Sequence, residues 1–465
     1  MEDTIAAIGT ALGESGIGII RISGPDSEKV VEQLFIPKNK ARWEQRVSHK
    51  LYLGHLRSGP GEEEILDQVL VTVMRRPRSY TGEDMAEIHC HGGFLVVRAA
   101  LEAVLKAGAR LAEPGEFTRR AFLNGKLDLA QAEAVIDLIR AKSRSGLKLA
   151  VSQLDGKLSQ EIDRCQEELL RVLAHLEAAI DFPEDEIEAM APEEMEAIAR
   201  EVWRRLDKLA AGFDKGRVLQ EGLKTVILGK PNVGKSSLLN ALLGRERAIV
   251  TDVPGTTRDL IEEYVDLGGV PLKLVDTAGV RFTEDLVERI GVERTKAVLK
   301  EADLVLFVLD AATGVTENDE LVWQLIQEAG VPRLILLNKV DLETALPEVR
   351  TIRDRLAVPE EAVIEISALT GYGLPALEEK VRLMVGMGEA KMDQEVLISR
   401  LRHRQSLRKA MDHLQEFLKA LQKRMPEDFL TIDLRGAWEA LGEINGKTVG
   451  EDVLDRIFAE FCIGK

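Results

Sequence analysis

The residues with the clearest chemical potential form a glycine-rich loop, Gly229-Lys230-Pro231-Asn232-Val233-Gly234-Lys235-Ser236. An apolar stretch precedes this loop and a helical pattern follows it, which is the setting that a phosphate-binding loop requires. Its glycines let backbone N–H groups wrap around phosphate oxygens, Lys235 can reach the β and γ oxygens, and the Ser236 hydroxyl can bind Mg²⁺. Taken alone, this loop could also be a chance glycine-rich turn between a strand and a helix.

Further motifs follow the loop in chain order. Asp276-Thr277-Ala278-Gly279 ends a predicted strand, where a carboxylate can hold the hydration shell of Mg²⁺ and a glycine N–H can sense the γ-phosphate. Asn338-Lys339-Val340-Asp341 ends another predicted strand, and Asp341 can accept both N–H donors on the guanine edge, whereas adenine would leave it poorly paired. Ser367-Ala368-Leu369 would complete the base pocket. This set resembles the signature of Ras-like GTPases and predicts a site for GTP and GDP.

A first switch loop is predicted at Gly255-Thr256-Thr257-Arg258-Asp259, with Thr257 as the Mg²⁺-binding threonine. Many Ras-like proteins follow the Asp-Thr-Ala-Gly motif with a glutamine that orients the attacking water, but here that position is Val280. An apolar side chain cannot align a water molecule, so another residue must do so. Three acidic side chains just downstream are candidates, although each could equally be a solvated charge: Glu284, Asp285 and Glu288.

The elements that must position these motifs alternate between short apolar strands and helical segments, which predicts a mainly parallel sheet. Helical spacing returns on both sides of this unit, so we predict a Ras-like domain inserted into a helical domain built from two chain segments. The strand candidates are 225–229, 273–276, 304–310, 333–339 and 363–367.

The N-terminal part has strand-like segments at 16–23 and 66–74 and helical spacing at 95–107, which predicts a mixed α+β domain. After Lys126 the apolar spacing becomes that of long amphipathic helices, one at 129–139 and a second at 147–180. The predicted segments are 1–120 for the N-terminal domain, 121–221 for the first helical part, 222–386 for the G domain and 387–465 for the second helical part.

Composition limits the function classes. The chain has 465 residues, 45% of them hydrophobic, with a net charge of −17 that repels phosphate backbones, so any contact with nucleic acid should be local or made through a partner. Three cysteines do not make a disulfide framework and favour a reducing compartment. With no apolar stretch near the roughly 18 residues of a membrane span, we expect a cytoplasmic protein without a membrane span.

The phosphate loop, the Gly-Thr-Thr-Arg-Asp loop and the terminal Phe461-Cys462-Ile463-Gly464-Lys465 together resemble the MnmE (TrmE) family. The resemblance covers essentially the full length, including the strings at 18–23, 80–84, 91–93, 114–117 and 121–134. It implies a homodimeric, K⁺-activated GTPase that modifies the wobble uridine of certain tRNAs with a one-carbon unit from a folate. It also implies a heterotetramer with an FAD-dependent partner of the MnmG (GidA) type, with tRNA held mainly by that partner.

By motif match, the side chain of Asn232 and the backbone carbonyls of Thr251, Val253 and Thr256 would bind K⁺, which can offset charge developing on the phosphates. Glu288 matches the family's water-orienting glutamate and would be catalytic together with Lys235 and Thr257. The predicted nucleotide contacts are Asn232, Val233, Gly234, Lys235, Ser236, Ser237, Thr251, Thr256, Thr257, Asp276, Thr277, Ala278, Gly279, Asn338, Lys339, Asp341, Ser367 and Ala368.

The family's N-terminal domain resembles folds that bind tetrahydrofolate, as the 5-formyl or methylene derivative. Its matched positions are Arg21, Glu87, Lys126 and Lys465. A carboxylate suits the N–H donors of a pterin ring, and Arg or Lys suits the glutamyl carboxylates. Read without the family, each of these residues is a surface charge or part of an ion pair at a strand end.

Two alternative functions belong to other classes. A non-enzymatic ribosome-assembly switch of the Era type would usually carry a basic RNA-binding module, which this sequence lacks. An independent folate-dependent methyltransferase in the N-terminal part would predict folate turnover by a fragment that ends near Gly212. His89-Cys90-His91 does not predict a metal site, because neighbours on a strand point to opposite faces.

Overall fold

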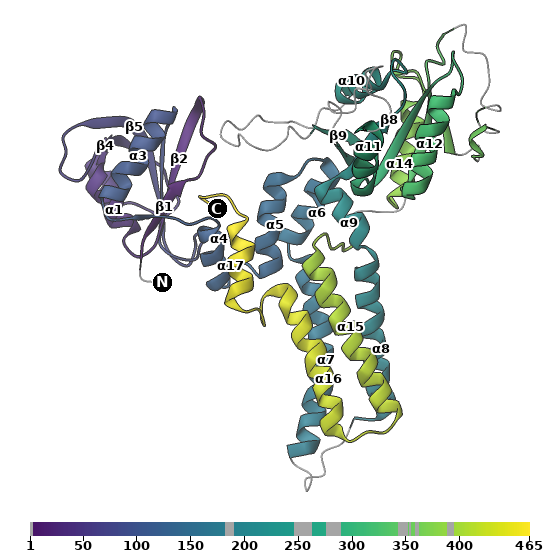
Figure 1. The fold of residues 1–465 in the computed structure, drawn as a ribbon. Coiled ribbons are helices and arrows are strands. Elements are labelled where there is room, and N and C mark those ends of the chain that lie inside the picture. Colours follow the sequence, from purple (N-terminus) through teal and green to yellow (C-terminus); the bar gives the residue numbers. More distant parts are fainter. Residues whose placement is uncertain are drawn as a thin grey trace.

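The computed structural model describes residues 3–181, 190–245, 263–275, 290–342, 352, 355–358, 362–387 and 395–465. Figure 1 shows an N-terminal sheet domain, an elongated helical region and a second sheet domain, with the C-terminus returning to the N-terminal domain. The described residues include no helix with the length and apolar character needed to cross a membrane.

The N-terminal domain is a sheet whose described strands run in the order β3-β4-β5-β6-β2-β1-β7. Inward residues such as Ile20, Ile22 and Ile88 pack against helices α1 and α3, which cover one face. The predicted α+β fold of this region is confirmed. The elements are β1 (Ile5–Ile8), β2 (Ser15–Ser23), α1 (Ser27–Leu34), β3 (Phe35–Pro37), α2 (Lys40–Glu44), β4 (Tyr52–Arg57), β5 (Ile65–Met74), β6 (Met85–Gly92), α3 (Phe94–Lys106) and β7 (Arg110–Leu111).

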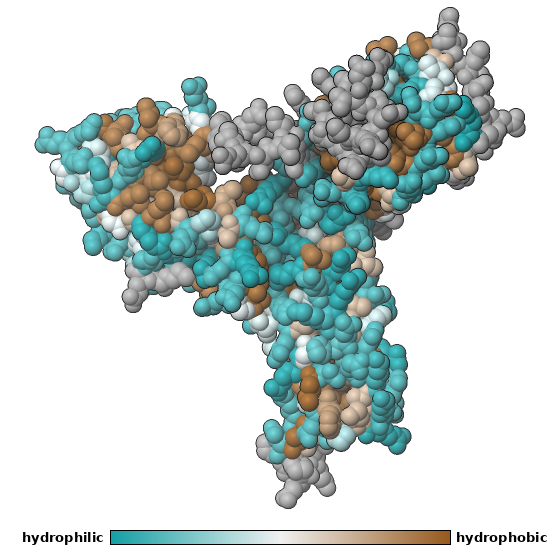
Figure 2. All heavy atoms as spheres, in the orientation of Figure 1, coloured by the Kyte–Doolittle hydropathy of each residue, from teal (hydrophilic) through white to brown (hydrophobic). Residues whose placement is uncertain are grey.

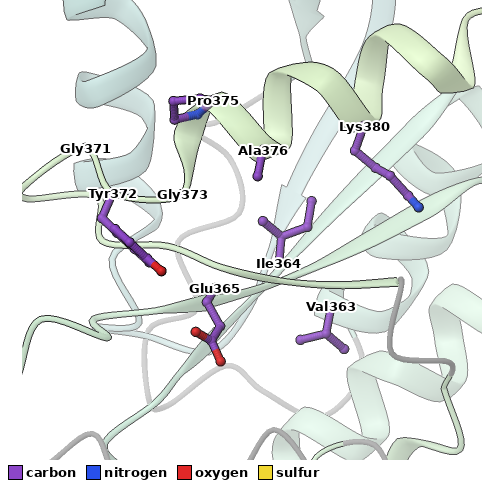
Figure 3. A pocket seen from close by; sticks show the side chains of 9 residues that line it. All are labelled: Val363, Ile364, Glu365, Gly371, Tyr372, Gly373, Pro375, Ala376 and Lys380. Atoms are coloured by element: carbon purple, nitrogen blue, oxygen red, sulfur yellow. The ribbon is translucent and has the colours of Figure 1, made fainter.

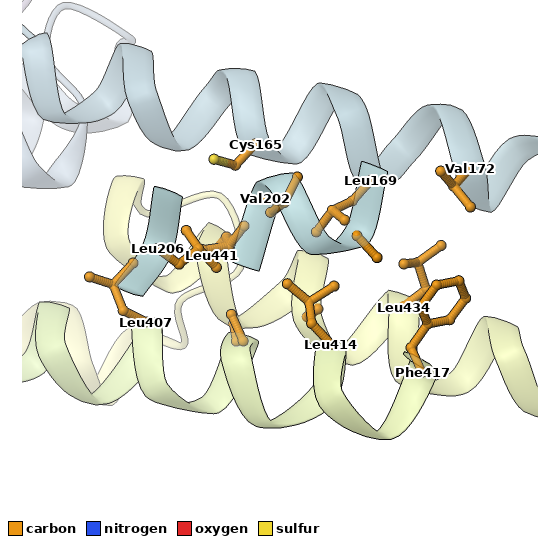
Figure 4. Packing of buried hydrophobic residues seen from close by; sticks show 14 of the residues in the cluster. Cys165, Leu169, Val172, Val202, Leu206, Leu407, Leu414, Phe417, Leu434 and Leu441 are labelled. Atoms are coloured by element: carbon orange, nitrogen blue, oxygen red, sulfur yellow. The ribbon is translucent and has the colours of Figure 1, made fainter. Parts of the chain in front are cut away.

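The helical region takes its helices from both sides of the second sheet domain, as predicted. Its long helices α7, α8, α15 and α16 bury one apolar stripe each in a shared core that includes Cys165, Leu206, Leu414 and Leu441 (Figure 4). The helices are α4 (Glu116–Leu123), α5 (Leu129–Arg140), α6 (Arg144–Leu154), α7 (Lys157–Asp181), α8 (Pro192–Ala211), α9 (Phe213–Glu221), α15 (Leu401–Gln422), α16 (Glu427–Asn445) and α17 (Glu451–Ala459).

One helix prediction was wrong. The single helix expected over 147–180 is two helices, α6 and α7, separated at Gly156. This glycine has a left-handed φ of +80°, which a continuing right-handed helix cannot contain. The side-chain amide of Gln131 donates to Leu154 O at 2.9 Å, so α5 satisfies a carbonyl that the break leaves open.

The second sheet domain has the predicted mainly parallel sheet, in the strand order β13-β12-β11-β8-β10-β9. Among the described strands, only β9 runs antiparallel to its neighbour. Helices α10 and α14 pack on one face and α11 and α12 on the other. The elements are β8 (Leu223–Leu228), α10 (Lys235–Arg245), β9 (Glu263–Leu267), β10 (Val270–Leu274), α11 (Ile290–Glu301), β11 (Leu304–Asp310), α12 (Glu317–Ala329), β12 (Arg333–Asn338), β13 (Val363–Glu365) and α14 (Leu374–Met384).

Candidate functional site

The glycine-rich loop joins the end of β8, inside the sheet, to the start of α10. Gly229 has φ +150°, and a Cβ there would lie 2.4 Å from Val308 O. Gly234 has φ +98°, and a Cβ there would lie 2.2 Å from Asn338 Nδ2. Both positions therefore require glycine, because a side chain would be strained and would also push the loop away from the neighbouring strands.

Lys235 is folded back over the loop. Its ammonium donates to Gly229 O and to Lys230 O, each at 2.7 Å. Burial lowers the pKa of Lys235, because desolvation disfavours the charged ammonium. Ser236 and Ser237 are exposed at the start of α10, where hydroxyl groups can meet a ligand at the helix N-terminus. The two carbonyls only partly compensate the positive charge of Lys235. A bound phosphate would supply an anionic partner for it.

Asn338 connects the base motif to the phosphate loop. It is buried, its amide donates to Val233 O at 2.8 Å, and its Oδ1 accepts from Ala368 N at 2.9 Å. The structure thus brings together residues from the loop after β8, the end of β12 and the segment after β13. Asp341, which is exposed, follows three residues later, where a base could reach it from solvent.

Ser367 and Lys339 are held by local contacts. Ser367 is fully buried, and its hydroxyl oxygen accepts from Thr370 N at 3.1 Å, which fixes the turn that carries Ala368. Lys339 has a left-handed φ of +68°, and its ammonium lies 2.6 Å from Asp310 Oδ2.

A cavity of about 680 Å³ lies beside β13 and the start of α14, as Figure 3 shows. None of the phosphate-loop residues, Asn338 or Asp341 lines it. The nucleotide motifs therefore define a different place on the domain, and this surface hollow is not the candidate nucleotide site. Its lining residues are Val363, Ile364, Glu365, Gly371, Tyr372, Gly373, Pro375, Ala376 and Lys380.

Several predicted site residues lie outside the described parts of the chain, so their places stay a prediction. They are Thr251, Val253, Thr256, Thr257, Asp276, Thr277, Ala278, Gly279 and Glu288, together with the alternatives Glu284 and Asp285.

A second cluster forms on the N-terminal sheet around Arg21. Arg21 on β2 pairs in register with Glu87 on β6, and its Nε lies 3.1 Å from Glu87 Oε1. Its Nη1 also donates to Gly464 O at 3.3 Å, which ties the C-terminal tail to this sheet. The guanidinium carbon lies 5.6 Å from the ring centroid of Tyr80 and 5.8 Å from that of Phe117. Arg21 therefore contacts a carboxylate and lies near the rings of a half-buried tyrosine and a fully buried phenylalanine.

The electrostatics of this cluster follow from its contacts. The hydrogen bond from His89, with the positive charge of Arg21, holds the pKa of Glu87 below its usual value. Burial and the charge of Arg21 lower the pKa of Lys465. The structure therefore brings Arg21, Glu87 and Lys465 together. Lys126 is exposed, and its ammonium donates to Pro77 O at 3.2 Å, on the loop that leads to Tyr80.

Sequence reasoning missed His89, Tyr80 and Phe117 as members of this cluster. His89 could have been found, because it lies two residues after Glu87 on a strand and so shares its face. Tyr80 and Phe117 lie in strings that carried the family resemblance, but nothing in the sequence alone placed their rings beside Arg21.

A phosphate loop after an inner strand of a parallel sheet, tied by a buried asparagine to a guanine-type base motif, defines a P-loop GTPase with a Ras-like domain. The model of the MnmE helical domain matches residues 129–462, and that of the GTP-binding protein TrmE N-terminus matches residues 4–126. The chain belongs to the MnmE (TrmE) family of tRNA modification GTPases.

Two relatives that align over their full length support this assignment. The tRNA modification GTPase MnmE of Desulforamulus reducens is 51% identical, and that of Heliobacterium modesticaldum is 52% identical. These alignments cover 100% of this chain and 100% and 99% of the relatives, respectively. The solved FeoB G-domain of Methanococcus jannaschii is 26% identical, with a TM-score of 0.27, over 35% of this chain and 97% of that one.

Proposed function

We propose that this protein uses GTP hydrolysis to drive modification of C5 of the wobble uridine (U34) in certain tRNAs to the aminomethyl or carboxymethylaminomethyl form. The family supplies the class of reaction. The observation that carries the proposal is the Lys235 loop, which Asn338 ties to the base motif. The loop that would bind phosphate and the segments that would bind guanine are thus joined by hydrogen bonds within the protein.

Within this site each side chain has a distinct task. Lys235 would leave the carbonyls of Gly229 and Lys230 and grip the β and γ phosphates of GTP. Asp341 would accept the N–H donors of guanine, and Ser236 and Thr257 would hold Mg²⁺, which neutralises phosphate charge. The segment at 276–279 would sense the γ-phosphate.

K⁺ is proposed as the activating ion, supplying positive charge beside the transferring phosphate. Asn232 fits a ligand role, because its side chain is exposed on the phosphate loop and its backbone has a left-handed φ of +65°. The carbonyls of Thr251, Val253 and Thr256 would complete the ligand set. Glu288 would orient the attacking water, since Val280 cannot.

The Arg21 cluster is proposed as the site of a tetrahydrofolate derivative, the 5-formyl or the methylene form. Glu87 fits the pterin N–H donors, and the half-buried ring of Tyr80, which lies against Arg21, offers an apolar face. Arg21, Lys126 and Lys465 fit the carboxylates of the glutamyl end. The folate would supply the one-carbon unit, while these side chains bind and orient it.

The proposed assembly is a homodimer that joins an FAD-dependent partner of the MnmG (GidA) type in a heterotetramer. Figure 2 shows hydrophobic residues gathered on the N-terminal domain, on the side in view. Leu53 and Leu70 pair across β4 and β5 on the sheet face opposite α1 and α3, and both are exposed. The net charge of −17 favours a partner that holds most of the tRNA.

The test is GTP hydrolysis in K⁺ and in Na⁺ by the parent, Asn232→Ala and Glu288→Ala. We expect the parent to be faster in K⁺ and Asn232→Ala to lose this difference. Glu288→Ala should lose about 100-fold or more in kcat while its GDP affinity stays unchanged, because only transition-state stabilisation is removed. Asn240→Ala, on the exposed side of α10, is the matched control and should behave as the parent. Equal parent rates in both salts would refute the K⁺ mechanism.

A further inference from the structure

Two lysines of the nucleotide loops are each held by a buried aspartate from one connecting segment. Lys339 of the base motif lies 2.6 Å from Asp310, the last residue of β11. Lys230 of the phosphate loop lies 3.1 Å from Asp319, in the first turn of α12. Asp310 is 6% exposed and Asp319 is fully buried. Residues 310–320 therefore contact both nucleotide loops.

The strand order explains why this segment can reach both loops. β11 pairs in parallel with β8 on one side and with β12 on the other. Parallel strands end at the same edge of the sheet, so the end of β11 lies between the loop after β8 and the loop after β12. The backbone confirms this closeness, because Ala311 N donates to Asn338 O at 2.9 Å.

Both carboxylates are fixed by their own segment. Asp310 Oδ1 accepts from Ala312 N at 2.9 Å, which leaves Oδ2 for Lys339. Asp319 Oδ2 accepts from Thr316 N at 2.9 Å and from Thr316 Oγ1 at 2.7 Å, as well as from Lys230. The other oxygen, Oδ1, is buried without a hydrogen-bond partner in the described parts of the chain. Among the described residues, Lys230 is therefore the cation that offsets this buried charge, and removing it would be costly.

The Asp319 contact continues to the phosphate-binding lysine. The backbone carbonyl of Lys230 accepts from Lys235 Nζ at 2.7 Å, while the Lys230 side chain is held by Asp319. The ion pair thus restrains the residue whose carbonyl holds Lys235 before nucleotide arrives. A loop restrained in its binding geometry loses less conformational entropy when phosphate binds.

We propose that Asp310 and Asp319 are positioning residues of the nucleotide site. Residues 310–320 restrain the position of the base loop through the ion pair with Lys339 and that of the phosphate loop through the ion pair with Lys230. This inference rests on the proposed nucleotide site and goes beyond its motifs. Asp319 acts on the phosphate end of the ligand, so its loss should weaken binding of GDP but not of guanosine. Asp310 acts on the guanine end, so its loss should weaken binding of both.

The experiment measures displacement of a fluorescent GDP by GDP and by guanosine, using the full chain. We expect Asp319→Asn to weaken GDP binding about tenfold and to leave guanosine binding unchanged. Asp310→Asn should weaken both ligands by a similar factor. In both variants KM for GTP should rise while kcat at saturating GTP stays within about twofold of the parent. Glu317→Gln removes an exposed charge from the same helix turn and is the matched control.

Other outcomes would overturn the inference. Unchanged GDP affinity in both variants would overturn it, because the aspartates would then stabilise only the fold. This holds even if the melting temperature of the nucleotide-free protein fell. An equal loss of GDP and guanosine binding in Asp319→Asn would also contradict it. Should Asp319→Asn fail to fold, the double variant Lys230→Met/Asp319→Asn removes both charges of the pair and must give the same selective loss. A parent that binds no GDP would instead refute the proposed function.

Discussion

At the scale of single residues, the phosphate loop shows how backbone conformation and chemistry depend on each other. Gly229 and Gly234 adopt φ values that side chains rarely allow, and neighbouring strands fill the space that a Cβ would need. Lys235 is desolvated, and its hydrogen bonds within the described parts of the chain go to two backbone carbonyls. The conformation of the loop therefore depends on its two glycines, and the Lys235 ammonium has no anionic partner among its described contacts.

Gly234→Ala should strongly weaken nucleotide binding. The new methyl group would lie 2.2 Å from Asn338 Nδ2 at a φ of +98°, so the loop or Asn338 must move. We expect about a 100-fold loss of GDP affinity by calorimetry and a loss of roughly 2 kcal/mol in the free energy of unfolding by urea titration. Gly244→Ala, near the end of the following helix α10, is the control: its methyl group meets nothing within 4 Å and should stabilise the protein slightly. Normal GDP binding by Gly234→Ala would contradict the loop geometry.

A buried network in the helical region makes stability depend on pH. Glu133 accepts from His403 at 2.8 Å and from Arg402 at 2.7 Å. Burial by itself would raise the pKa of Glu133, but His403 and Arg402 outweigh it and hold that pKa well below its usual range. Burial lowers the pKa of His403 from the ordinary 6.5. Both groups therefore take up protons more readily in the unfolded chain.

It follows that the free energy of unfolding should fall as the pH drops below about 6.5, where unfolded His403 gains a proton, and further below about 4.5, where unfolded Glu133 does. Each group adds at most about 1.4 kcal/mol per pH unit. Urea titrations from pH 7 to pH 5 would measure the slope. His403→Gln should make this slope shallower, because it removes the buried imidazole. The same slope in the parent and His403→Gln would show that His403 does not cause it.

At the scale of elements, the C-terminal tail completes the Arg21 cluster. Ile463 bridges to Pro114, and Gly464, with φ +94°, leaves no space for a Cβ, which would lie 2.2 Å from Ile8 O. The tail is thus seated against β1 by a glycine, and this seating places Lys465 near Arg21 and Glu87.

Gly464→Ala should lift the tail and weaken binding of 5-formyl-tetrahydrofolate about tenfold, because Lys465 would leave the cluster. Calorimetry would measure the affinity, and GTP hydrolysis should stay at the parent rate. Gly450→Ala, before α17, meets nothing within 4 Å and is the matched control. Folate binding equal to that of the parent in Gly464→Ala would remove the tail from the proposed site.

At the scale of the whole molecule, the exposed sheet face of the N-terminal domain bears on assembly. Leu53 and Leu70 are 38% and 37% exposed, and they share this face with the Arg21–Glu87 pair, because residues two apart on a strand point the same way. A dimer formed here would bring two folate-type sites toward one interface.

Leu70→Lys should convert the proposed dimer to a monomer at micromolar concentration, because the change places a charge in the apolar contact. Light scattering after size exclusion would measure the mass. Leu383→Lys makes the same change on the exposed side of α14 and should leave the mass unchanged. A dimeric Leu70→Lys protein would show that the copies meet elsewhere, and a monomeric parent would refute the homodimer itself.

The sequence by itself determined the family, the phosphate loop, the base motif and the mainly parallel sheet. These features are local: their residues are adjacent in the chain, and the hydrophobic period of each segment shows its element type. The predicted residues outside the described parts, Glu288 among them, stay predictions.

Only the tertiary structure decided which distant residues meet. Asp310 lies 29 residues before Lys339, Glu133 lies 270 before His403, and Arg21 lies 443 before Gly464. No local pattern encodes such pairs, because a charge that finds a buried partner has the same sequence signal as a solvated one. The break at Gly156 has a similar cause: apolar spacing continues across it, and the left-handed turn is satisfied by an amide from another helix.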